Sequence, residues 1–577
     1  MHFHRNNNFD GVLPHLFCMK QFFTFLLGAL ALQASAQNAP SWTSAVNLPI
    51  TPAFNIEPSF ATDAAGNTYL ATGFVQSATL APGTVVTSQT SLFNTPTRDG
   101  IVAKYGPTGN LLWYRQLSGS LNESFQKVII DASGNVMLMG LATDGTQFGT
   151  VTFNTSTFGP ALVLARLDAQ GQVQYVREVG SGTILLPAGL ASDAAGNYYL
   201  SGSFGLDATF GSTSLTTPVT TTYGVDQYVV KVSAAGEVQW AQQGGRIFPT
   251  SASTALPFSE LVADPNGSVY FVWTCPPTAG GFGSLALPAG NGDYDGLVVK
   301  FNTQGTPLWA KRVGGAGADL PTHPGLDGSG RLVVPGMAAP AGTLASPASA
   351  TATSTTTGFV AVLEPTAGAL AWSRELQATR AGGYRSVTAD ATGNIYLAGH
   401  FSGQGSLPGK ALTGAGGLDA LVVCYSADGT LRWTQQSAGT GDEIPTNIAL
   451  DGANRPVVQG ILTSSGLFGA TALSSSATAT GTGTPFVAYM GSVVTANRAE
   501  QAAMLALYPN PATAAAAVQL PALPAGTQLT LIDGLGRVAR REAAGTTLRL
   551  AGLTPGLYVV QATAPSGVQW ASRLKVE

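Results

Sequence analysis

Eight charged residues stand just before or within the first strand expected in the units of a repeated segment. Carboxylates with one Arg and one His around a central funnel would suit a polar ligand, a cation or a glycosidase-like pair of carboxylates. A solvated rim of charges is the alternative interpretation. Unlike the Asp turns described below, these residues hold no single register in the repeat. The eight residues are Glu57, Glu123, Glu260, Asp319, His323, Arg385, Asp442 and Glu443.

The inventory for catalysis is otherwise small. After the first 36 residues only His323 and His400 remain, so a site with three His ligands cannot be built. The sequence has no Gly-x-Ser-x-Gly, His-Glu-x-x-His or Cys-x-x-Cys motif. A hydrolase or lyase that uses only carboxylates stays open, because the fold sets the separation of two carboxylates. No cofactor is predicted, and the weak candidates for a cation site are Asp293 and Asp295.

Composition excludes several classes of protein. The chain has 577 residues, with 27 Lys and Arg against 31 Asp and Glu, which gives a formal net charge of -4. This balance excludes a basic nucleic-acid-binding protein. No stretch after residue 36 has the roughly 20 apolar residues that a membrane-spanning helix needs. With 45% hydrophobic residues, 71 Gly and 34 Pro, we expect an all-β protein with packed cores and many turns.

An internal repeat specifies the elements that must position the charged residues. The motif Asp-x-x-Gly-Asn-x-Tyr-Leu recurs, and Asp-x-x-Val-x-Lys follows it with a Gly and then an aromatic residue. Each unit is interpreted as four short antiparallel strands joined by tight turns. Four strands repeated seven times predict a seven-bladed β-propeller. The units are about 65 residues long, and their turns begin at Asp63, Asp131, Asp193, Asp264, Asp327, Asp390 and Asp451.

These motifs resemble the bacterial seven-bladed β-propeller repeat family over about residues 41–492. A linear solenoid is the alternative architecture. The seventh unit has its third strand at residues 486–489 but lacks the strand that runs from Gly to Trp. The chain begins instead with an unpaired strand around Trp42. Because a free sheet edge is a liability, we expect this N-terminal strand to complete the last four-stranded blade.

The two ends of such blades differ in sequence. Long, variable connections lie at one end, and binding residues favour loops that a rigid scaffold positions, so we expect the long-loop face to bind. The repeated Asp is interpreted as a turn cap and not a calcium ligand, because each turn has only one acid. The recurrent Trp or Tyr of each unit is interpreted as packing between blades and not as a sugar-stacking ring.

The two ends of the chain predict export. An apolar run at residues 22–32, between Lys20 and a small-residue cleavage site, predicts a signal peptide over residues 1–36, with translation starting at Met19. The propeller then spans residues 37–494, and residues 495–503 form a polar linker. Alternating apolar residues with Gly and Pro between them predict a small Ig-like β-sandwich over residues 504–577.

Short motifs within this last segment resemble the type A C-terminal sorting domain of the type IX secretion system. The resemblance implies a Bacteroidota-type bacterium, transport across the outer membrane by the type IX machinery, and attachment of the body to the cell surface. Gly and Pro in these motifs set turns, so their own physical role is to shape the chain. The motif residues are Tyr508, Pro509, Asn510, Pro511, Asp533, Gly536, Arg537, Gly556, Tyr558 and Lys575.

The sequence favours a secreted or surface-attached, noncatalytic propeller that binds a glycan or protein ligand through its long-loop face. A secreted hydrolase or lyase with funnel carboxylates is the second hypothesis, and a structural surface-coat protein is the third. Two carboxyls about 5 to 10 Å apart in a pocket, at least one with a raised pKa, would favour the enzyme. Shallow and dispersed charges would favour the binding module.

Overall fold

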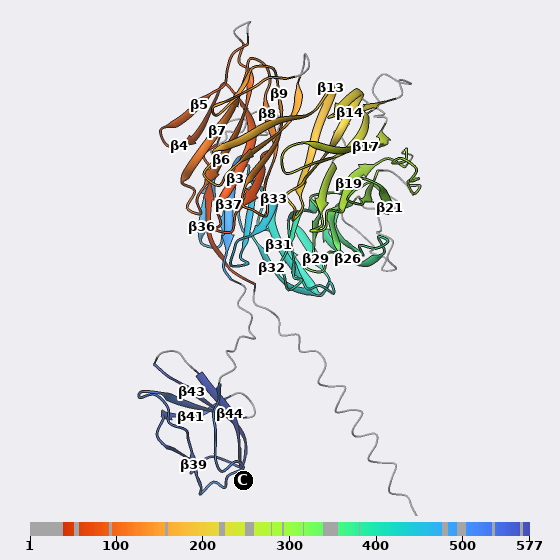
Figure 1. Ribbon diagram of the computed structural model, residues 1–577. Coiled ribbons are helices and arrows are strands. Elements are labelled where there is room, and N and C mark those ends of the chain that lie inside the picture. Colours follow the sequence, from red (N-terminus) through yellow and green to blue (C-terminus); the bar gives the residue numbers. More distant parts are fainter. Residues whose placement is uncertain are drawn as a thin grey trace, which may run out of the picture. The chain divides into compact units, whose positions relative to one another are not determined.

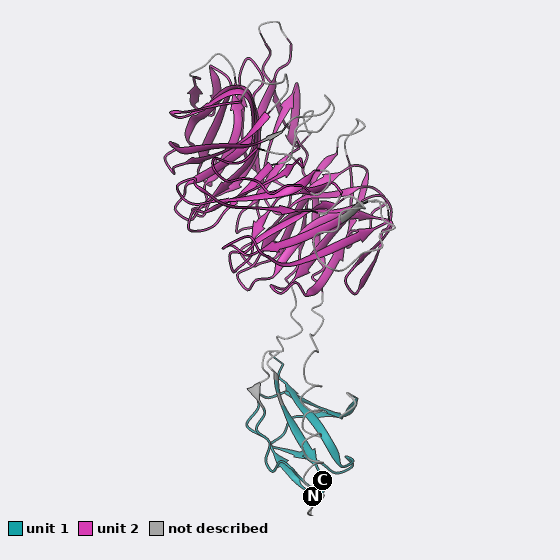
Figure 2. Cartoon of the chain, turned by 90° about the vertical axis from the view of Figure 1, so that its right-hand side faces the viewer, with its two compact units in different colours: residues 1–38, 494–577 teal, residues 39–493 magenta. Residues whose placement is uncertain are grey.

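The chain forms two compact units, residues 39–493, here called the body, and a C-terminal unit that contains residues 503–577 (Figure 2). The computed structural model describes residues 39–50, 57–91, 95–155, 160–217, 225–247, 259–277, 280–290, 294–314, 317–338, 356–379, 381–475, 483–492, 503–533, 537–565 and 569–577. The predicted signal peptide and almost all of the predicted linker lie outside these residues.

The body is built from antiparallel meanders of four strands that pair in chain order, and its described residues contain no helix (Figure 1). The first meanders are β2 (Ser59–Thr62), β3 (Thr68–Val75), β6 (Arg98–Tyr105) and β7 (Leu111–Ser118); β8 (Ser124–Ile130), β9 (Val136–Ala142), β12 (Ala161–Leu167) and β13 (Val173–Ser192); and β13, β14 (Tyr198–Phe210), β16 (Val225–Val232) and β17 (Val238–Ile247). The long strand β13 therefore belongs to two meanders.

The remaining meanders of the body follow the same order. They are β18 (Ser259–Ala263), β19 (Val269–Cys275), β20 (Asp295–Phe301) and β21 (Pro307–Val313); β22 (Asp319–Pro321) with β23 (Gly325–Leu326), β24 (Leu332–Ala338), β25 (Thr356–Leu363) and β26 (Leu370–Ala378); β27 (Ala381–Ala389), β28 (Ile395–Ser402), β31 (Asp419–Tyr425) and β32 (Leu431–Gln436); and β33 (Glu443–Leu450), β34 (Pro456–Leu462), β37 (Thr484–Met490) and β1 (Trp42–Asn47).

Short strands extend several meanders at the end where the connections are long. They are β4 (Ser77–Ala81), β5 (Thr84–Thr87), β10 (Thr146–Phe148), β11 (Val151–Phe153), β15 (Thr213–Thr216), β29 (Gln404–Leu407), β30 (Lys410–Thr413), β35 (Ser465–Phe468) and β36 (Thr471–Ser474). The third strands of the meanders carry near-continuous apolar runs, and every residue of β20 and β31 is buried. Such runs are expected where both faces of a strand are covered.

The N-terminal strand pairs with the last meander, as the sequence predicts. β1 runs antiparallel to β37, with Ala45 opposite Ala488 and Val46 opposite Val487. One hydrophobic cluster also joins Val457 and Val487 of this last meander to Leu70 of β3. In Figure 1 the orange N-terminal strands accordingly lie beside the blue β37. The end of the body is therefore packed against its beginning.

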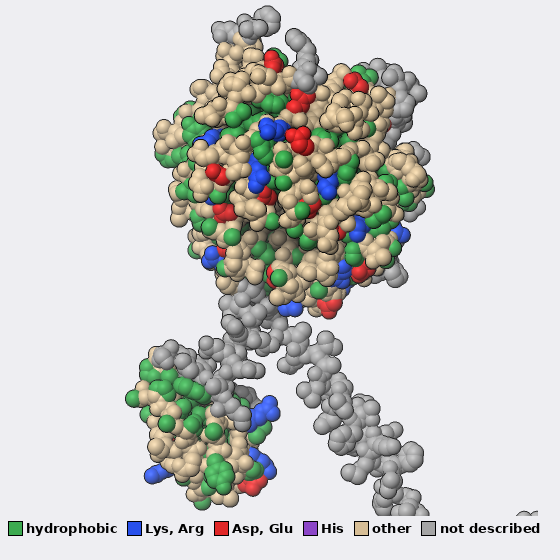
Figure 3. All heavy atoms as spheres, viewed as in Figure 1, with side chains coloured by type: hydrophobic (Ala, Val, Ile, Leu, Met, Phe, Trp, Pro, Cys, Tyr) green, Lys and Arg blue, Asp and Glu red, His purple; other side chains and the backbone are tan. Residues whose placement is uncertain are grey.

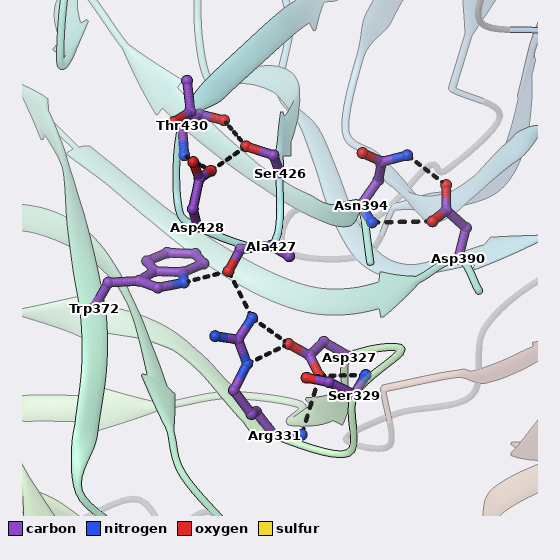
Figure 4. A network of polar contacts seen from close by, with 10 residues as sticks. All are labelled: Asp327, Ser329, Arg331, Trp372, Asp390, Asn394, Ser426, Ala427, Asp428 and Thr430. Atoms are coloured by element: carbon purple, nitrogen blue, oxygen red, sulfur yellow. Dashed lines mark hydrogen bonds and ion pairs between the residues drawn. The ribbon is translucent and has the colours of Figure 1, made fainter. Parts of the chain in front are cut away.

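The recurrent aromatic residue connects neighbouring meanders. The indole nitrogen of Trp372 donates a hydrogen bond of 2.9 Å to the carbonyl oxygen of Ala427 in a turn of the next meander (Figure 4). Trp113 and Trp240 do the same to Ala169 and Thr303. A bonded indole can be buried at low cost, and its ring area stabilises the contact. The interpretation of these residues as packing between units is supported.

The repeated Asp caps its own turn. Asp327 Oδ1 accepts hydrogen bonds from the backbone nitrogens of Ser329 at 2.9 Å and Arg331 at 3.0 Å (Figure 4). Gly330 in the same turn has a φ of +81°, a conformation that glycine adopts without strain. Burial opposes ionisation of Asp327, but the hydrogen bonds from Ser329 and Arg331 outweigh it and lower its pKa. This geometry fits the turn cap.

The C-terminal unit consists of a five-stranded sheet in the order β38, β44, β43, β40, β41 and a two-stranded sheet of β39 and β42. A hydrophobic cluster that includes Leu529, Leu548 and Val560 forms its core. Its strands are β38 (Ala503–Met504), β39 (Ala517–Gln519), β40 (Gln528–Asp533), β41 (Val538–Ala543), β42 (Thr547–Arg549), β43 (Gly556–Thr563) and β44 (Gln569–Val576).

Candidate functional site

The first strand of each meander, which enters the Asp turn, contributes one residue four positions before that Asp. Five of these residues line a single cavity of about 200 Å³, here called the first-strand cavity. Segments spread over most of the body therefore converge on one small space. The seven residues at this position are Ser59, Lys127, Gly189, Glu260, His323, Ser386 and Asn447, and the cavity is lined by all except Gly189 and Ser386.

A β-bulge recurs one residue earlier in four of the first strands. The pairing register shifts at Gln126 in β8, Ala188 in β13, Arg385 in β27 and Thr446 in β33. A bulge inserts an extra residue and redirects the side chains around it, and bulges are frequent next to functional sites. Gln126 and Thr446 both line the first-strand cavity. The bulges thus bring two consecutive polar residues of one strand to the same wall.

Lys127, Glu260 and His323 form a charged cluster in this cavity. Lys127 Nζ forms an ion pair with Glu260 Oε1 and lies 3.1 Å from His323 Nε2. His323 Nε2 is also 3.2 Å from Glu260 Oε1. The side chain of Glu260 is only 8% exposed, whereas that of His323 is 36% exposed. The three residues come from three different meanders, so the cluster ties distant first strands together.

The hydrogen bonds around His323 indicate its tautomer. Its Nδ1 is 3.0 Å from the carbonyl oxygen of Arg385, which can only accept a hydrogen bond. Nδ1 therefore carries the proton and donates. Nε2 lies between Lys127 Nζ and Glu260 Oε1, so it accepts from the lysine in the neutral ring and donates to the carboxylate in the protonated ring.

The electrostatics of Glu260 do not suit a general acid. Burial opposes ionisation of this carboxyl, but Lys127 and His323 together outweigh the burial and lower its pKa. A glycosidase-like acid needs the opposite shift, because it must hold a proton near neutral pH. Glu260 is therefore a permanent anion whose charge Lys127 balances.

The rest of the cavity has an apolar wall and a few polar groups. Phe60, Leu190 and Leu261 belong to the apolar wall. The exposed Glu57 lines the cavity and has no hydrogen bond or ion pair within the described part of the chain. Two buried polar atoms, Gln126 Oε1 and Thr446 Oγ1, have no hydrogen-bond partner there either. Unsatisfied buried groups are costly, but both atoms are closed off in this conformation, so a ligand in the cavity bonds to them only when the Gln126 or Thr446 side chain turns toward it.

Three of the predicted rim acids lie elsewhere. Glu123, Asp319 and Glu443 are completely buried and do not line the first-strand cavity. Each stands eight residues before an Asp turn, so these three share one position although the eight predicted residues together do not. Each also follows an acid at the start of a third strand by 24 residues, in the pairs Asp99 and Glu123, Asp295 and Asp319, and Asp419 and Glu443.

These three pairs, here called the acid pairs, share a backbone contact. The nitrogen of Glu443 donates to the carbonyl oxygen of Leu418 at 2.7 Å, and Glu123 and Asp319 make the equivalent contact. Burial raises the pKa of Glu443 to about 7, although a hydrogen bond from Ser437 opposes the shift. Burial likewise raises the pKa of Asp99 to about 6. The repulsion between neighbouring carboxylates adds to the shift at Glu443.

Arg385 and Asp442 act near His400 and outside the cavity lining. Asp442 Oδ1 accepts a hydrogen bond from the backbone nitrogen of Leu418 at 2.9 Å. Burial lowers the pKa of His400 to about 4, with a further contribution from Arg385 that Asp442 opposes. His400 Nδ1 is buried without a hydrogen-bond partner in the described chain.

The weak cation candidates find little support. Asp293 lies outside the described residues. Asp295 Oδ2 is 3.2 Å from Arg312 Nη1, so a cationic side chain already occupies the position next to this carboxylate. Within the described ranges, no group of three or more His, Cys, Asp and Glu residues could hold a metal ion.

The predicted sorting residues meet at one end of the C-terminal sheet. Asn510 donates to the carbonyl oxygen of Arg573 at 2.6 Å and accepts from the nitrogen of Lys575 at 3.0 Å. Asp533 pairs across the sheet with Tyr558 and forms an ion pair with Arg537 at 2.9 Å. Gly556 begins β43. Tyr508 precedes Pro509, and Asn510 precedes Pro511, while Gly536 lies outside the described residues.

Lys127 is the functional candidate that the sequence reasoning missed. Lys127 is positively charged, whereas most of the predicted rim residues are acids. The rest of its strand has the composition of an ordinary core strand. Aligning the seven units on their Asp turns would have placed Lys127, Glu260 and His323 at one position. The register of the repeat was therefore the available signal.

Charge is sparse on the visible surface of the body. Figure 3 shows a face on which Lys, Arg, Asp and Glu side chains stand singly or in small mixed groups among uncharged ones. No helix in the described part of the chain is long and apolar enough to cross a membrane.

Comparison with known proteins gives only distant likenesses. No family model and no curated protein matches the chain. Similar solved structures include PorZ, a surface component of the type IX secretion system of Porphyromonas gingivalis, with 11% identity, coverage of 89% of this chain and 73% of PorZ, and a TM-score of 0.23. A puromycin hydrolase matches with 9% identity, 74% and 61% coverage, and a TM-score of 0.29. This chain thus spans 61% of the hydrolase.

Two further likenesses come from other proteins. A Synechocystis apocarotenoid oxygenase has 9% identity, with 76% of this chain and 94% of the oxygenase covered and a TM-score of 0.30. The extracellular domain of a putative one-component system from B. thetaiotaomicron has 9% identity, 91% and 88% coverage, and a TM-score of 0.21. Scores this low carry no argument about activity or ligand.

Proposed function

We propose that the protein is an exported, noncatalytic binding protein whose body is a seven-bladed β-propeller. Each four-strand meander would be one blade, and β1 would close the ring by completing the blade of β33, β34 and β37. The pairing of β1 with β37 and the hydrophobic clusters between successive meanders support this architecture. The single cluster that joins the last meander to the first supports a ring over a solenoid.

Export is proposed from the two ends of the chain. Residues 1–36 would be removed as a signal peptide, and residues 504–577 would form an Ig-like sandwich that the type IX secretion machinery recognises. The convergence of the sorting residues on one end of β40, β43 and β44 supports one recognition surface. The body would then be released or held at the cell surface.

Ligand binding is proposed for the first-strand cavity. The observation that carries this is the cavity itself, about 200 Å³ in volume and lined by polar residues of several first strands. Ligand sites are concave and combine apolar surface with convergent polar groups, and this cavity has both kinds of lining. Its volume lies below the roughly 300 Å³ at which typical drug-sized pockets begin, so it would take a small molecule.

A binding screen tests this function. The full mature chain is titrated with a panel of monosaccharides, amino acids, small amines and small carboxylates, first by thermal shift and then by calorimetry. Ser59→Leu, which fills the cavity, should abolish binding of any hit. Ser212→Leu changes an exposed turn residue of the body and should leave binding intact. The proposal is contradicted if no compound of the panel binds, or if a compound binds Ser59→Leu as tightly as the wild type.

The carboxylate hydrolase has less support. Asp99 and Glu443, whose pKa values are raised, belong to the acid pairs, which are buried outside the cavity, while Glu260 inside it has a lowered pKa. The cavity therefore pairs no raised carboxyl with a second one within the described residues.

A further inference from the structure

The polar groups left over in the first-strand cavity define what a ligand must bring. Lys127 is paired with Glu260, and His323 is engaged by Lys127 and by the carbonyl oxygen of Arg385. Two of the three donors on Lys127 Nζ and the Nδ1 donor of His323 are therefore used within the protein. What remains to meet a ligand comes from Glu57, Gln126 and Thr446.

These remaining groups are rich in acceptors. The Glu57 carboxylate and Gln126 Oε1 can only accept hydrogen bonds, and the Thr446 hydroxyl can accept as well as donate. The side-chain amide nitrogen of Gln126 already donates to Ser124 Oγ at 2.6 Å. The amide oxygen of the same side chain is therefore left as a hydrogen-bond acceptor. A ligand that satisfies these atoms must be a hydrogen-bond donor.

The charge balance points the same way. Lys127 neutralises Glu260, so Glu57 is the one cavity carboxylate without a cationic partner in the described chain. A cationic ligand would offset that charge, whereas an anion would be repelled by it. Phe60, Leu190 and Leu261 offer an apolar surface to the rest of the ligand.

We propose that the first-strand cavity binds a small organic ammonium ion, with the ammonium group at Glu57 and Gln126 and an apolar body against Phe60 and Leu261. This inference rests on the proposed function and adds the chemical class of the ligand. A primary ammonium supplies three donors and a positive charge, which matches the unused acceptors. Neutral and anionic molecules of the same shape lack one or both of these features.

Three probes of nearly equal shape test the inference on the full mature chain. They are 2-phenylethylamine, 2-phenylethanol and 3-phenylpropionate, which are cationic, neutral and anionic at pH 7. Calorimetry should show binding of the amine, binding of the alcohol weaker by about tenfold, and still weaker binding of the propionate, because a charged hydrogen bond contributes about 1.5 kcal/mol or more.

A matched pair of variants localises the charge effect. Glu57→Gln should weaken the binding of the amine about tenfold and leave the binding of the alcohol unchanged. Glu237→Gln, at an exposed turn, should change neither affinity. Circular dichroism and thermal unfolding confirm that both variants fold. The inference is overturned if the alcohol or the propionate binds as tightly as the amine or more tightly. It is also overturned if Glu57→Gln leaves the affinity for the amine unaltered, or if the amine does not bind. If only the alcohol binds and Ser59→Leu blocks it, the ammonium class falls while the cavity keeps its proposed function.

Discussion

At the scale of single residues, the ion pair between Lys127 and Glu260 controls the chemistry of the cavity. Both side chains are largely buried, and the two residues are 133 positions apart in sequence. Removing two charges from water costs about as much as their attraction returns, so such a pair adds little net stability. Losing one partner is different, because the remaining charge stays buried and uncompensated.

A double-mutant cycle measures this asymmetry. Lys127→Met should lower the free energy of unfolding by about 2 to 4 kcal/mol, because it leaves the Glu260 carboxylate buried without its cation. The double variant Lys127→Met, Glu260→Met should return to within about 1 kcal/mol of the wild type. Urea unfolding measures both values. A double variant no more stable than Lys127→Met alone would contradict the interpretation.

At the scale of elements, the acid pairs hold the start of one first strand against a third strand of the preceding meander. Their carboxyls are buried near one another, and the pKa of Glu443 is raised to about 7 from an ordinary value of 4.5. The folded protein therefore keeps a proton that the unfolded chain releases at lower pH. Protonated, a pair can share hydrogen bonds, whereas two anions repel.

The stabilising contribution of Glu443 should accordingly fall as the pH rises, whereas His400, whose pKa is lowered to about 4, contributes in the opposite direction up to about pH 6.5. A raised folded pKa contributes stability that is present below pH 4.5 and is lost as the pH rises through about 7 at Glu443. Urea unfolding between pH 4.5 and 8 should show that the stability of the wild type relative to Glu443→Gln declines by on the order of 2 kcal/mol. Glu443→Gln keeps the shape and should flatten the curve, while Glu237→Gln should not. A stability difference between the wild type and Glu443→Gln that rises over this range would refute the protonated pair.

At the scale of the whole molecule, the body depends on a contact between its two ends. β1 and β37 are separated by nearly all of the body in sequence yet pair residue by residue. This arrangement removes the free edges that a linear array of meanders would expose.

A covalent bond across this contact tests the closure. Ala45 and Ala488 are direct partners on adjacent strands and both are buried. The variant Ala45→Cys, Ala488→Cys should therefore form a disulfide with the two strands in their present positions. Cross-linking over so long a loop should raise the stability by about 3 kcal/mol. Non-reducing electrophoresis should show a faster band that reductant abolishes. Ala45→Cys alone should run unchanged, and a double variant that stays reduced would argue against the pairing.

The sequence predicts much of the fold because its signals are local. The Asp turns, the recurrent Trp and the missing last strand are all visible as spacing and composition, and the pairing of β1 with β37 is confirmed. The candidate site was predicted only in part. Glu57, Glu260 and His323 line one cavity, but Glu123, Asp319 and Glu443 are buried in a different register. Charge alone does not distinguish these two positions along a strand.

By itself the sequence determined the repeat, the turn that each Asp caps and the strand type of each segment, since these depend on residues a few positions apart. Only the tertiary structure decided which first strands converge and which side chains meet. Lys127, Glu260 and His323 touch because the first strands of three meanders reach one small space. Contacts between residues up to 196 positions apart follow from the packing of whole meanders, which no local pattern encodes.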